Sequence, residues 1–178
     1  KIFGKVPQNL APLFFANGFI QEAFISNFYN QQDDVFFVSK FLNPERLRDI
    51  EKDRLIGLAN QLAATNPTNN KTSLRTAGYE VRRLIKADAA TISEIYGQVF
   101  ETYPFPIDDP AYILKSMDDN VQYFGIEKDG KLVALASAEI DFKGGNAEMT
   151  DFATLKKHTG RNLSSLLLRR MEDEMKKQ

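Results

Sequence analysis

The alternation of apolar and polar residues divides the chain into two patterned stretches. The first covers residues 1–65 and the second covers residues 79–178. Between them, residues 66–78 contain Pro, Asn, Thr, Ser and Gly without an apolar period, which is typical of a linker. The pattern therefore predicts a small N-terminal unit, a linker and a larger second unit.

The first stretch has the pattern of a β-α-β-β unit followed by a helix. It predicts strands at 1–7, 19–28 and 33–42 and a short helix at 10–17. Asn43-Pro44-Glu45 is typical of a helix start, with Pro at the first helical position. Apolar residues at helical spacing from Leu47 to Leu62 extend this helix to about residue 64.

The second stretch has a clearer pattern. It predicts strands at 80–85, 122–127, 131–141 and 147–155, and helices at 88–100, 108–117 and 163–177. Asp129-Gly130 is typical of a two-residue hairpin turn, and the prolines of Tyr103-Pro-Phe-Pro-Ile107 separate the first two helices. For the last helix we predict an inner stripe of Leu163, Leu166, Leu167, Arg170, Met171 and Met175. This order predicts a mixed α/β (α+β) fold.

Composition and charge exclude several function classes. The 178 residues are 43% hydrophobic and 26% charged, as in globular proteins, and contain no apolar run long enough for a membrane span. A net charge of −1 argues against a protein that binds nucleic acid by neutralising many phosphates. With no Cys and one His, a metal centre or a thiol nucleophile is not expected. We expect no nucleic-acid or membrane partner and a cytoplasmic location, since no export leader is recognisable.

Neither end of the sequence has the features of a natural terminus. Lys1 is not a Met, and Gln178 lies inside a charged helical pattern without a cap. We therefore expect the chain to continue beyond both residues.

The segment from Thr154 to Ser164 has the strongest chemical signal. It takes the chain from a predicted strand through a polar loop with Gly160 into a helix start, where unpaired N–H groups and the helix dipole favour an anion. It has neither the Gly-Lys-Ser/Thr of a phosphate-binding P-loop nor the G-x-G-x-x-G of a dinucleotide fold. Taken alone, it is equally compatible with an ordinary strand-to-helix connection.

The element order of residues 79–178 resembles the first part of the GNAT N-acetyltransferase superfamily. In that superfamily the loop reads Arg/Gln-x-x-Gly-x-Gly/Ala and wraps the pyrophosphate of acetyl-CoA. Here Thr159 stands at the first position, Asn162 at the central glycine and Ser164 at the last small residue. Asn is the residue other than Gly that best tolerates a left-handed backbone. The resemblance implies acetyl-CoA as cosubstrate and no metal.

Four segments carry a narrower resemblance. Tyr103–Ile107, Lys131–Asp141, Asn146–Leu155 and Leu166–Met175 look like the beta-lysine N-acetyltransferase family of bacteria and archaea, as do several segments before residue 43. The resemblance implies acetylation of the terminal amine of beta-lysine, which yields a compatible solute. It also implies further strands after the last helix, and the N-terminal unit is similar to a GNAT C-terminal half.

A catalytic base is expected for this chemistry. A lysine-like amine has a pKa near 10.4, so presenting it deprotonated at pH 7 costs roughly 4 to 5 kcal/mol. The resemblance places a catalytic Glu on the strand before the loop, which makes Glu148 the first choice and Asp151 the second. The alternative for both is a solvated or salt-bridged strand residue.

The resemblance also implies the binding residues. For acetyl-CoA these are Phe152, Ala153, Thr154, Leu155, Thr159, Gly160, Arg161, Asn162, Leu163 and Ser164. For the acceptor amine they are Tyr103, Phe105, Asp108, Glu139 and Asp141. The alternatives are core packing for Tyr103 and Phe105 and helix N-capping for Asp108 and its neighbour Asp109. For His158 a surface or stacking role is favoured over catalysis. The general acid is expected beyond residue 178.

Two other functions stay open at this point. One is acetylation of a different small amine or amino acid by the same fold. The other is a GNAT-like domain that binds acyl-CoA or a partner protein without catalysis, which the loop departures at Thr159, Asn162 and Ser164 suggest. A homodimer is also left open.

Overall fold

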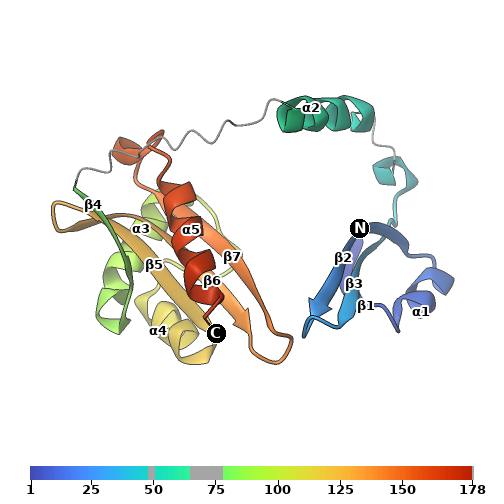
Figure 1. Cartoon of the computed structure of the whole chain (residues 1–178), viewed down its shortest axis with the longest axis horizontal. Helices are drawn as coiled ribbons and strands as arrows, with labels where there is room; N and C mark the ends of the chain where they lie inside the picture. The colour runs from blue at the N-terminus through green and yellow to red at the C-terminus, as the bar shows by residue number, and fades with distance from the viewer. Residues whose placement is uncertain (48–50, 65–77, 178) are drawn as a thin grey trace. The chain divides into compact units, whose positions relative to one another are not determined.

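The computed structural model describes residues 1–47, 51–64 and 78–177 (Figure 1). It has two sheets with flanking helices, so the mixed α/β fold expected from the sequence is confirmed. The chain divides into two compact units, Lys1–Thr72 with Lys143–Asn146, and Ser73–Phe142 with Ala147–Gln178. Apart from Gly78, the linker expected over residues 66–78 lies outside the described residues.

The first unit contains a three-stranded antiparallel sheet. Its elements are β1 (Ile2–Pro7), α1 (Ala11–Ala16), β2 (Ile20–Tyr29) and β3 (Asp33–Lys40). The strand order is β1-β3-β2, so the last strand lies in the middle. Val6, Ala11 and Val38 form a small core in which α1 packs on one face of the sheet.

The helix expected from residue 43 to residue 64 is not continuous. The structure has a 3-10 turn at Pro44–Leu47 and α2 at Lys52–Ala64, and residues 48–50 lie outside the described part. Leu55, Leu58 and Leu62 of the predicted apolar stripe are all exposed. The helical period is therefore present in α2, but among the described residues no surface covers its stripe.

The second unit is built on a four-stranded sheet of order β4-β5-β6-β7. Its strands are β4 (Tyr79–Arg83), β5 (Val121–Lys128), β6 (Lys131–Asp141) and β7 (Asn146–Thr154). Its helices are α3 (Ala89–Val99), α4 (Pro110–Asp119) and α5 (Leu163–Met175). The β4–β5 and β5–β6 pairs are antiparallel, and the predicted turn at Asp129-Gly130 is confirmed with φ values of 52° and 73°.

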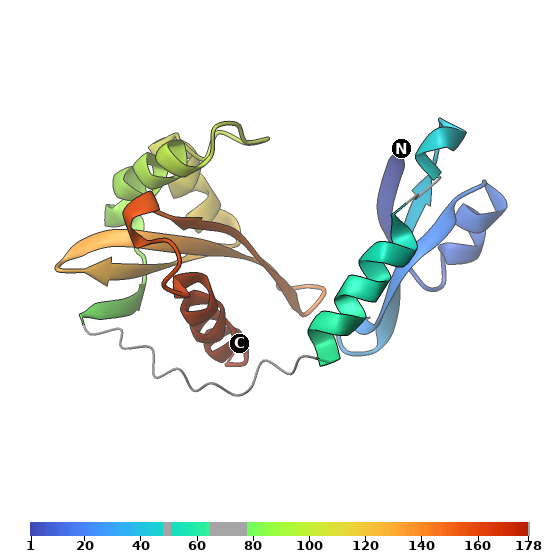
Figure 2. The ribbon, with the colours of Figure 1, turned by 90° about the horizontal axis from the view of Figure 1, so that it is seen from above.

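Helices cover both faces of this sheet, with α3 and α4 on one side and α5 on the other (Figure 2). On the α3/α4 side, Ile92, Tyr96 and Ile113 pack against Leu135 of the central strand β6. On the α5 side, Ala134, Ala136 and Ala138 of β6 form a core cluster with Leu163, Leu167 and Met171 of α5. The alternation along β6 therefore assigns its alanines to α5 and its Leu135 and Ser137 to the opposite face.

The predicted inner stripe of α5 is correct except at one position. Leu163, Leu167 and Met171 are buried, whereas Arg170 is exposed and forms an ion pair with Glu174 at 2.8 Å. The guanidinium group keeps its hydration at the helix surface, where the i, i+4 carboxylate is within reach. Arg170 therefore belongs to the outer face of α5.

Candidate functional site

Strand β7 has an unusual backbone conformation at Asp151. Its φ of 53° places this residue in the left-handed region, within a strand. Asp is among the residues that tolerate this region. A left-handed residue is nevertheless uncommon inside a strand, where it produces a local kink. The carboxylate of Asp151 contacts residues of the α3/α4 side of the sheet, as its hydrogen bonds show.

Three hydroxyl groups donate hydrogen bonds to the Asp151 carboxylate. Ser137 Oγ on β6 lies 2.7 Å from Oδ2, Thr150 Oγ1 lies 3.2 Å from Oδ1, and the Tyr103 hydroxyl also donates to Oδ1. Ser137 is fully buried, whereas Asp151 and Tyr103 are half-buried. The site is therefore a partly accessible carboxylate held by neutral hydroxyl donors.

The tyrosines around this carboxylate keep their protons. Burial, together with the hydrogen bond to Asp151, raises the pKa of Tyr103 to about 12. Burial and then the negative charge of Asp151 raise the pKa of Tyr96 well above its usual value. The Tyr96 hydroxyl is fully buried and has no well-formed hydrogen bond among the described residues. These groups are donors, not bases, at physiological pH.

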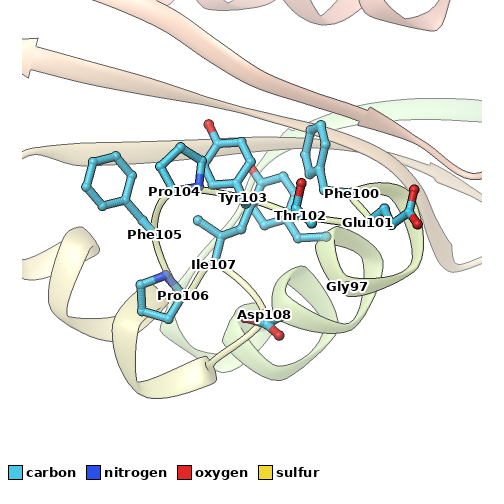
Figure 3. Close-up of a pocket in the computed structure, with 11 residues that line it drawn as sticks. Gly97, Phe100, Glu101, Thr102, Tyr103, Pro104, Phe105, Pro106, Ile107 and Asp108 are labelled. Atoms are coloured by element: carbon cyan, nitrogen blue, oxygen red, sulfur yellow. The ribbon is translucent and has the colours of Figure 1, made fainter.

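A cavity of about 380 Å³ lies beside this cluster (Figure 3). It is lined by Tyr96 and Gly97 of α3 and by the loop from Phe100 to Asp108. Three of the predicted acceptor residues, Tyr103, Phe105 and Asp108, are among its lining residues. The structure therefore brings these three together, in a pocket with aromatic walls and acidic groups.

The other two predicted acceptor residues are on β6. Glu139 and Asp141 are exposed and do not line the cavity. The charge of Glu139 nevertheless contributes to the raised pKa of Tyr103 and of Tyr112 on α4, which places its carboxylate in their neighbourhood. Helix capping, the alternative for Asp108 and Asp109, is confirmed for Asp109, which accepts the Ala111 N–H at 2.9 Å as the N-cap of α4.

The two predicted catalytic carboxylates have different surroundings. Glu148 is exposed on β7, three residues before the kink. Asp151 is held from several sides and lies next to the aromatic loop through Tyr103. Asp151 is therefore the carboxylate that the structure connects to the pocket-lining loop.

The predicted cofactor loop has a conformation that directs N–H groups to one place. Gly160 and Asn162 have φ values of 74° and 62°, and α5 begins at Leu163. Asn162 thus adopts the left-handed conformation that a glycine would adopt, and its Oδ1 accepts a hydrogen bond from Ser165 Oγ at 2.8 Å. The N–H groups of the first turn of α5 have no acceptor within the helix.

The remaining residues predicted to contact the cofactor differ in availability. Ala153 is buried, Phe152 packs on the α5 side, and Thr154 is half-buried. The Leu155 N–H donates to Val133 O at 2.9 Å, and the Leu163 side chain lies in the core. In the loop, Thr159 Oγ1 donates to Lys156 O, while Arg161 and Ser164 are exposed. Of Leu163, therefore, only the backbone is free to take part in an anion site, whereas Arg161 and Ser164 are exposed as whole residues.

His158 has the packing role that the sequence favoured. Its Nδ1 lies 3.1 Å from the Tyr79 hydroxyl, and the two rings meet edge to face. Within residues 1–47, 51–64 and 78–177, no group of three or more acidic or His side chains could hold a metal ion. In the same ranges, no helix has the length and apolarity needed to cross a membrane.

Sequence reasoning missed Ser137, Thr150 and Tyr96. Ser137 lies in a nearly continuous apolar stretch of β6, and a lone hydroxyl in such a stretch is a usable signal for a buried polar contact. Thr150 and Tyr96 gave no signal of this kind. Thr is common in strands and Tyr is common in cores, whether or not their hydroxyls have a role.

Comparison with known proteins gives a consistent picture. The sequence model of the acetyltransferase (GNAT) family matches residues 90–178. A beta-lysine N(6)-acetyltransferase of Methanococcus maripaludis is 41% identical over 176 residues, which is 99% of this chain and 63% of that protein. The protein of the same name from Methanosarcina mazei is 45% identical over 98 residues, 55% of this chain and 36% of that protein. The chain thus spans less than two thirds of the length of these relatives.

Among solved structures, the PaiA N-acetyltransferase of Thermoplasma acidophilum in complex with coenzyme A aligns with a TM-score of 0.48 and 18% identity. The alignment covers 56% of this chain and 72% of that chain.

Proposed function

We propose that this chain, which belongs to the acetyltransferase (GNAT) family, is part of an enzyme that transfers acetyl from acetyl-CoA to the terminal amine of beta-lysine. The observation that carries the proposal is the 41% identity, over 99% of the chain, with a beta-lysine N(6)-acetyltransferase. The Asp151 carboxylate supports it, because it accepts a hydrogen bond from Tyr103, which lines the aromatic pocket, and an alkylammonium acceptor needs a negative group near its binding pocket. We place the enzyme in the cytoplasm and its product among compatible solutes.

The first chemical requirement is a neutral amine. Removing the proton from a lysine-like ammonium at pH 7 costs roughly 4 to 5 kcal/mol, so a carboxylate that attracts the cation and accepts its proton lowers the barrier. Asp151 and Glu148 are the carboxylates proposed for this step. Asp151 is favoured, because its hydroxyl partners hold it next to the loop that forms the pocket.

The second requirement is stabilisation of the oxyanion that forms when the amine attacks the thioester carbonyl. β7 lies at the edge of the four-stranded sheet, so among the described residues no strand pairs with its outer side. We propose that N–H groups of the segment Phe152–Thr154 donate to this oxygen. The C–N bond then forms and the C–S bond breaks. After the C–N bond has formed, the nitrogen loses a second proton, which the leaving thiolate takes up, and the first proton, removed from the ammonium, leaves to water.

The third requirement is a site for the pyrophosphate of acetyl-CoA, whose thioester supplies the acetyl group. The left-handed Asn162 and the exposed N–H groups at the start of α5 fit an anion at the positive end of a helix. Arg161 is exposed beside them and adds a positive charge. Thr154 lies on the way from this loop to Asp151 along the same strand.

The test is turnover by the full-length protein. Acetyl-CoA is supplied with beta-lysine, lysine or spermidine, and thiol release is measured together with product mass. We expect the highest kcat/KM with beta-lysine and an acetyl group on its terminal nitrogen. Equal or better turnover of lysine or spermidine would contradict the assigned acceptor. Absence of acetyl-CoA binding in calorimetry at near-millimolar ligand would contradict a transferase and favour the non-catalytic alternative.

A further inference from the structure

The kink at Asp151 keeps a strained backbone in a strand that could otherwise be regular. A left-handed conformation costs a residue with a side chain roughly 1 kcal/mol or more, and such strain persists only where surrounding contacts determine it. The contacts here are the hydrogen bonds from Ser137, Thr150 and Tyr103. They come from β6, from β7 itself and from the loop after α3, so the carboxylate is fixed from three directions.

The hydrogen-bonding capacity of this carboxylate is nearly filled. A carboxylate has about four lone-pair sites, and three hydroxyl donors leave about one. Ser137 cannot move easily because it is fully buried. Tyr103 remains a donor at physiological pH, since its pKa is raised to about 12. The remaining lone-pair site of the Asp151 carboxylate therefore has a defined direction and can accept a hydrogen bond from one N–H donor.

The Tyr96 hydroxyl provides a second, independent observation at this place. It is fully buried without a well-formed hydrogen bond among the described residues, and the Asp151 charge contributes to its raised pKa. Buried hydroxyls of this kind are normally satisfied, by protein, by ordered water or by a ligand atom. Tyr96 also lines the cavity formed by the loop after α3. The Tyr96 hydroxyl, which Ser137 also approaches, is thus a second enclosed polar group in the neighbourhood of Asp151.

We propose that Tyr103 and Ser137 are positioning residues that direct the remaining acceptor site of Asp151 toward the ammonium group of the substrate, so that Asp151 binds this group and removes its proton. The inference rests on the proposed function and specifies how its acceptor is recognised. One proton moves from the ammonium nitrogen to Asp151, the nitrogen lone pair is freed for attack, and Asp151 returns the proton to water after turnover.

The hydrogen bond from Tyr103 also connects the pocket to the base. Phe100 and Tyr103 are ring neighbours at 5.1 Å, and both line the cavity. The residue that orients the carboxylate thus also forms part of the apolar wall that receives the carbon chain of the acceptor. Binding of the acceptor's carbon chain by this wall therefore also places its amine next to Asp151.

The experiment is a double-mutant cycle in the full-length protein with Tyr103→Phe, Asp151→Asn and the double variant. We expect Tyr103→Phe to lower kcat/KM for the amine about 10- to 100-fold, as expected for loss of a hydrogen bond to a charged group, with the KM for acetyl-CoA unchanged. Asp151→Asn lowers kcat/KM at least about 100-fold. In the Asp151→Asn background, Tyr103→Phe has less than about a 3-fold effect, because the group through which it acts is already lost.

Tyr123→Phe is the matched control. Tyr123 lies in the same core cluster, and its hydroxyl bonds to Ser116 at 2.9 Å instead of Asp151. We expect its kcat/KM within about 3-fold of wild type, even if its stability falls. Ser137→Ala is the second positioning variant, and it is expected to resemble Tyr103→Phe. Equal losses from Tyr103→Phe in both backgrounds, or a loss as large in Tyr123→Phe, would overturn the proposal.

A binding measurement separates this inference from the proposed function. Calorimetric titration with the amine alone needs no turnover, and we expect weaker binding by Asp151→Asn and Tyr103→Phe than by wild type. Wild-type protein that binds the amine with this dependence but transfers no acetyl group would refute the transferase and keep the recognition site. Unchanged amine binding in both variants would refute the recognition site, whatever the turnover.

Discussion

Asn162 offers a sharp test of the proposed anion site, because its proposed role there depends on one backbone angle. Its φ of 62° and ψ of 29° lie in the left-handed region, where an alanine pays roughly 1 kcal/mol more than a glycine. Asn162→Ala and Asn162→Gly both remove the exposed hydrogen bond from Ser165, so the difference between them reports the backbone alone. We expect acetyl-CoA to bind Asn162→Ala about 5-fold more weakly than Asn162→Gly.

The assay is calorimetric titration of the full-length variants with acetyl-CoA and, separately, with coenzyme A. Since both ligands carry the same pyrophosphate, the ratio of the two variants is expected to be the same for each. Asn162→Gly is expected near wild type, because the loop keeps its conformation without strain. Identical dissociation constants for the Ala and Gly variants would refute the assignment of the pyrophosphate to this loop.

The remaining predictions concern stability. Leu167 of α5 is fully buried against the sheet, so Leu167→Ala is expected to lower the free energy of unfolding by about 2 to 5 kcal/mol in urea titrations, whereas Leu168→Ala at the partly exposed neighbour should cost under about 1 kcal/mol. Asp88 accepts two hydrogen bonds from Arg82 at 2.8 Å, which hold its pKa below the usual value of 3.8, so the stability from this pair is present at neutral pH and is lost as the pH falls below about 4. Asp88→Asn should remove that part of the acid dependence while costing about 1 kcal/mol at pH 7, and an unchanged acid profile would contradict the sign.

The elements that periodicity specifies strongly were predictable. Helices α3 and α5 and the hairpin at Asp129-Gly130 follow from apolar spacing and turn chemistry, which act over a few residues. The exposed stripe of α2 shows the limit of this reasoning, because a period says which face is apolar and not whether a partner surface lies within reach.

The candidate site was predictable only in its separate parts. Tyr103 and Asp151 were both expected to act, yet their hydrogen bond joins segments that are 48 positions apart in the sequence. The left-handed backbone of Asp151 leaves no trace in the local pattern, because the sequence of residues 146–154 reads as a regular strand. What brings Tyr103 to Asp151 is the packing of the loop after α3 against the α3/α4 side of the sheet, which is a tertiary contact.

The row of alanines on β6 has a consequence for how this fold can be tuned. Because Ala134, Ala136 and Ala138 present single methyl groups to α5, the helix axis can lie close to the sheet. The height of α5 in turn fixes where its first N–H groups stand relative to the edge strand. These alanines therefore act as spacers. A substitution at one of these alanines, which touches no ligand, can change the affinity of the proposed anion site at the N-terminus of α5. Affinity can thus be adjusted without changing the loop from Thr159 to Ser164.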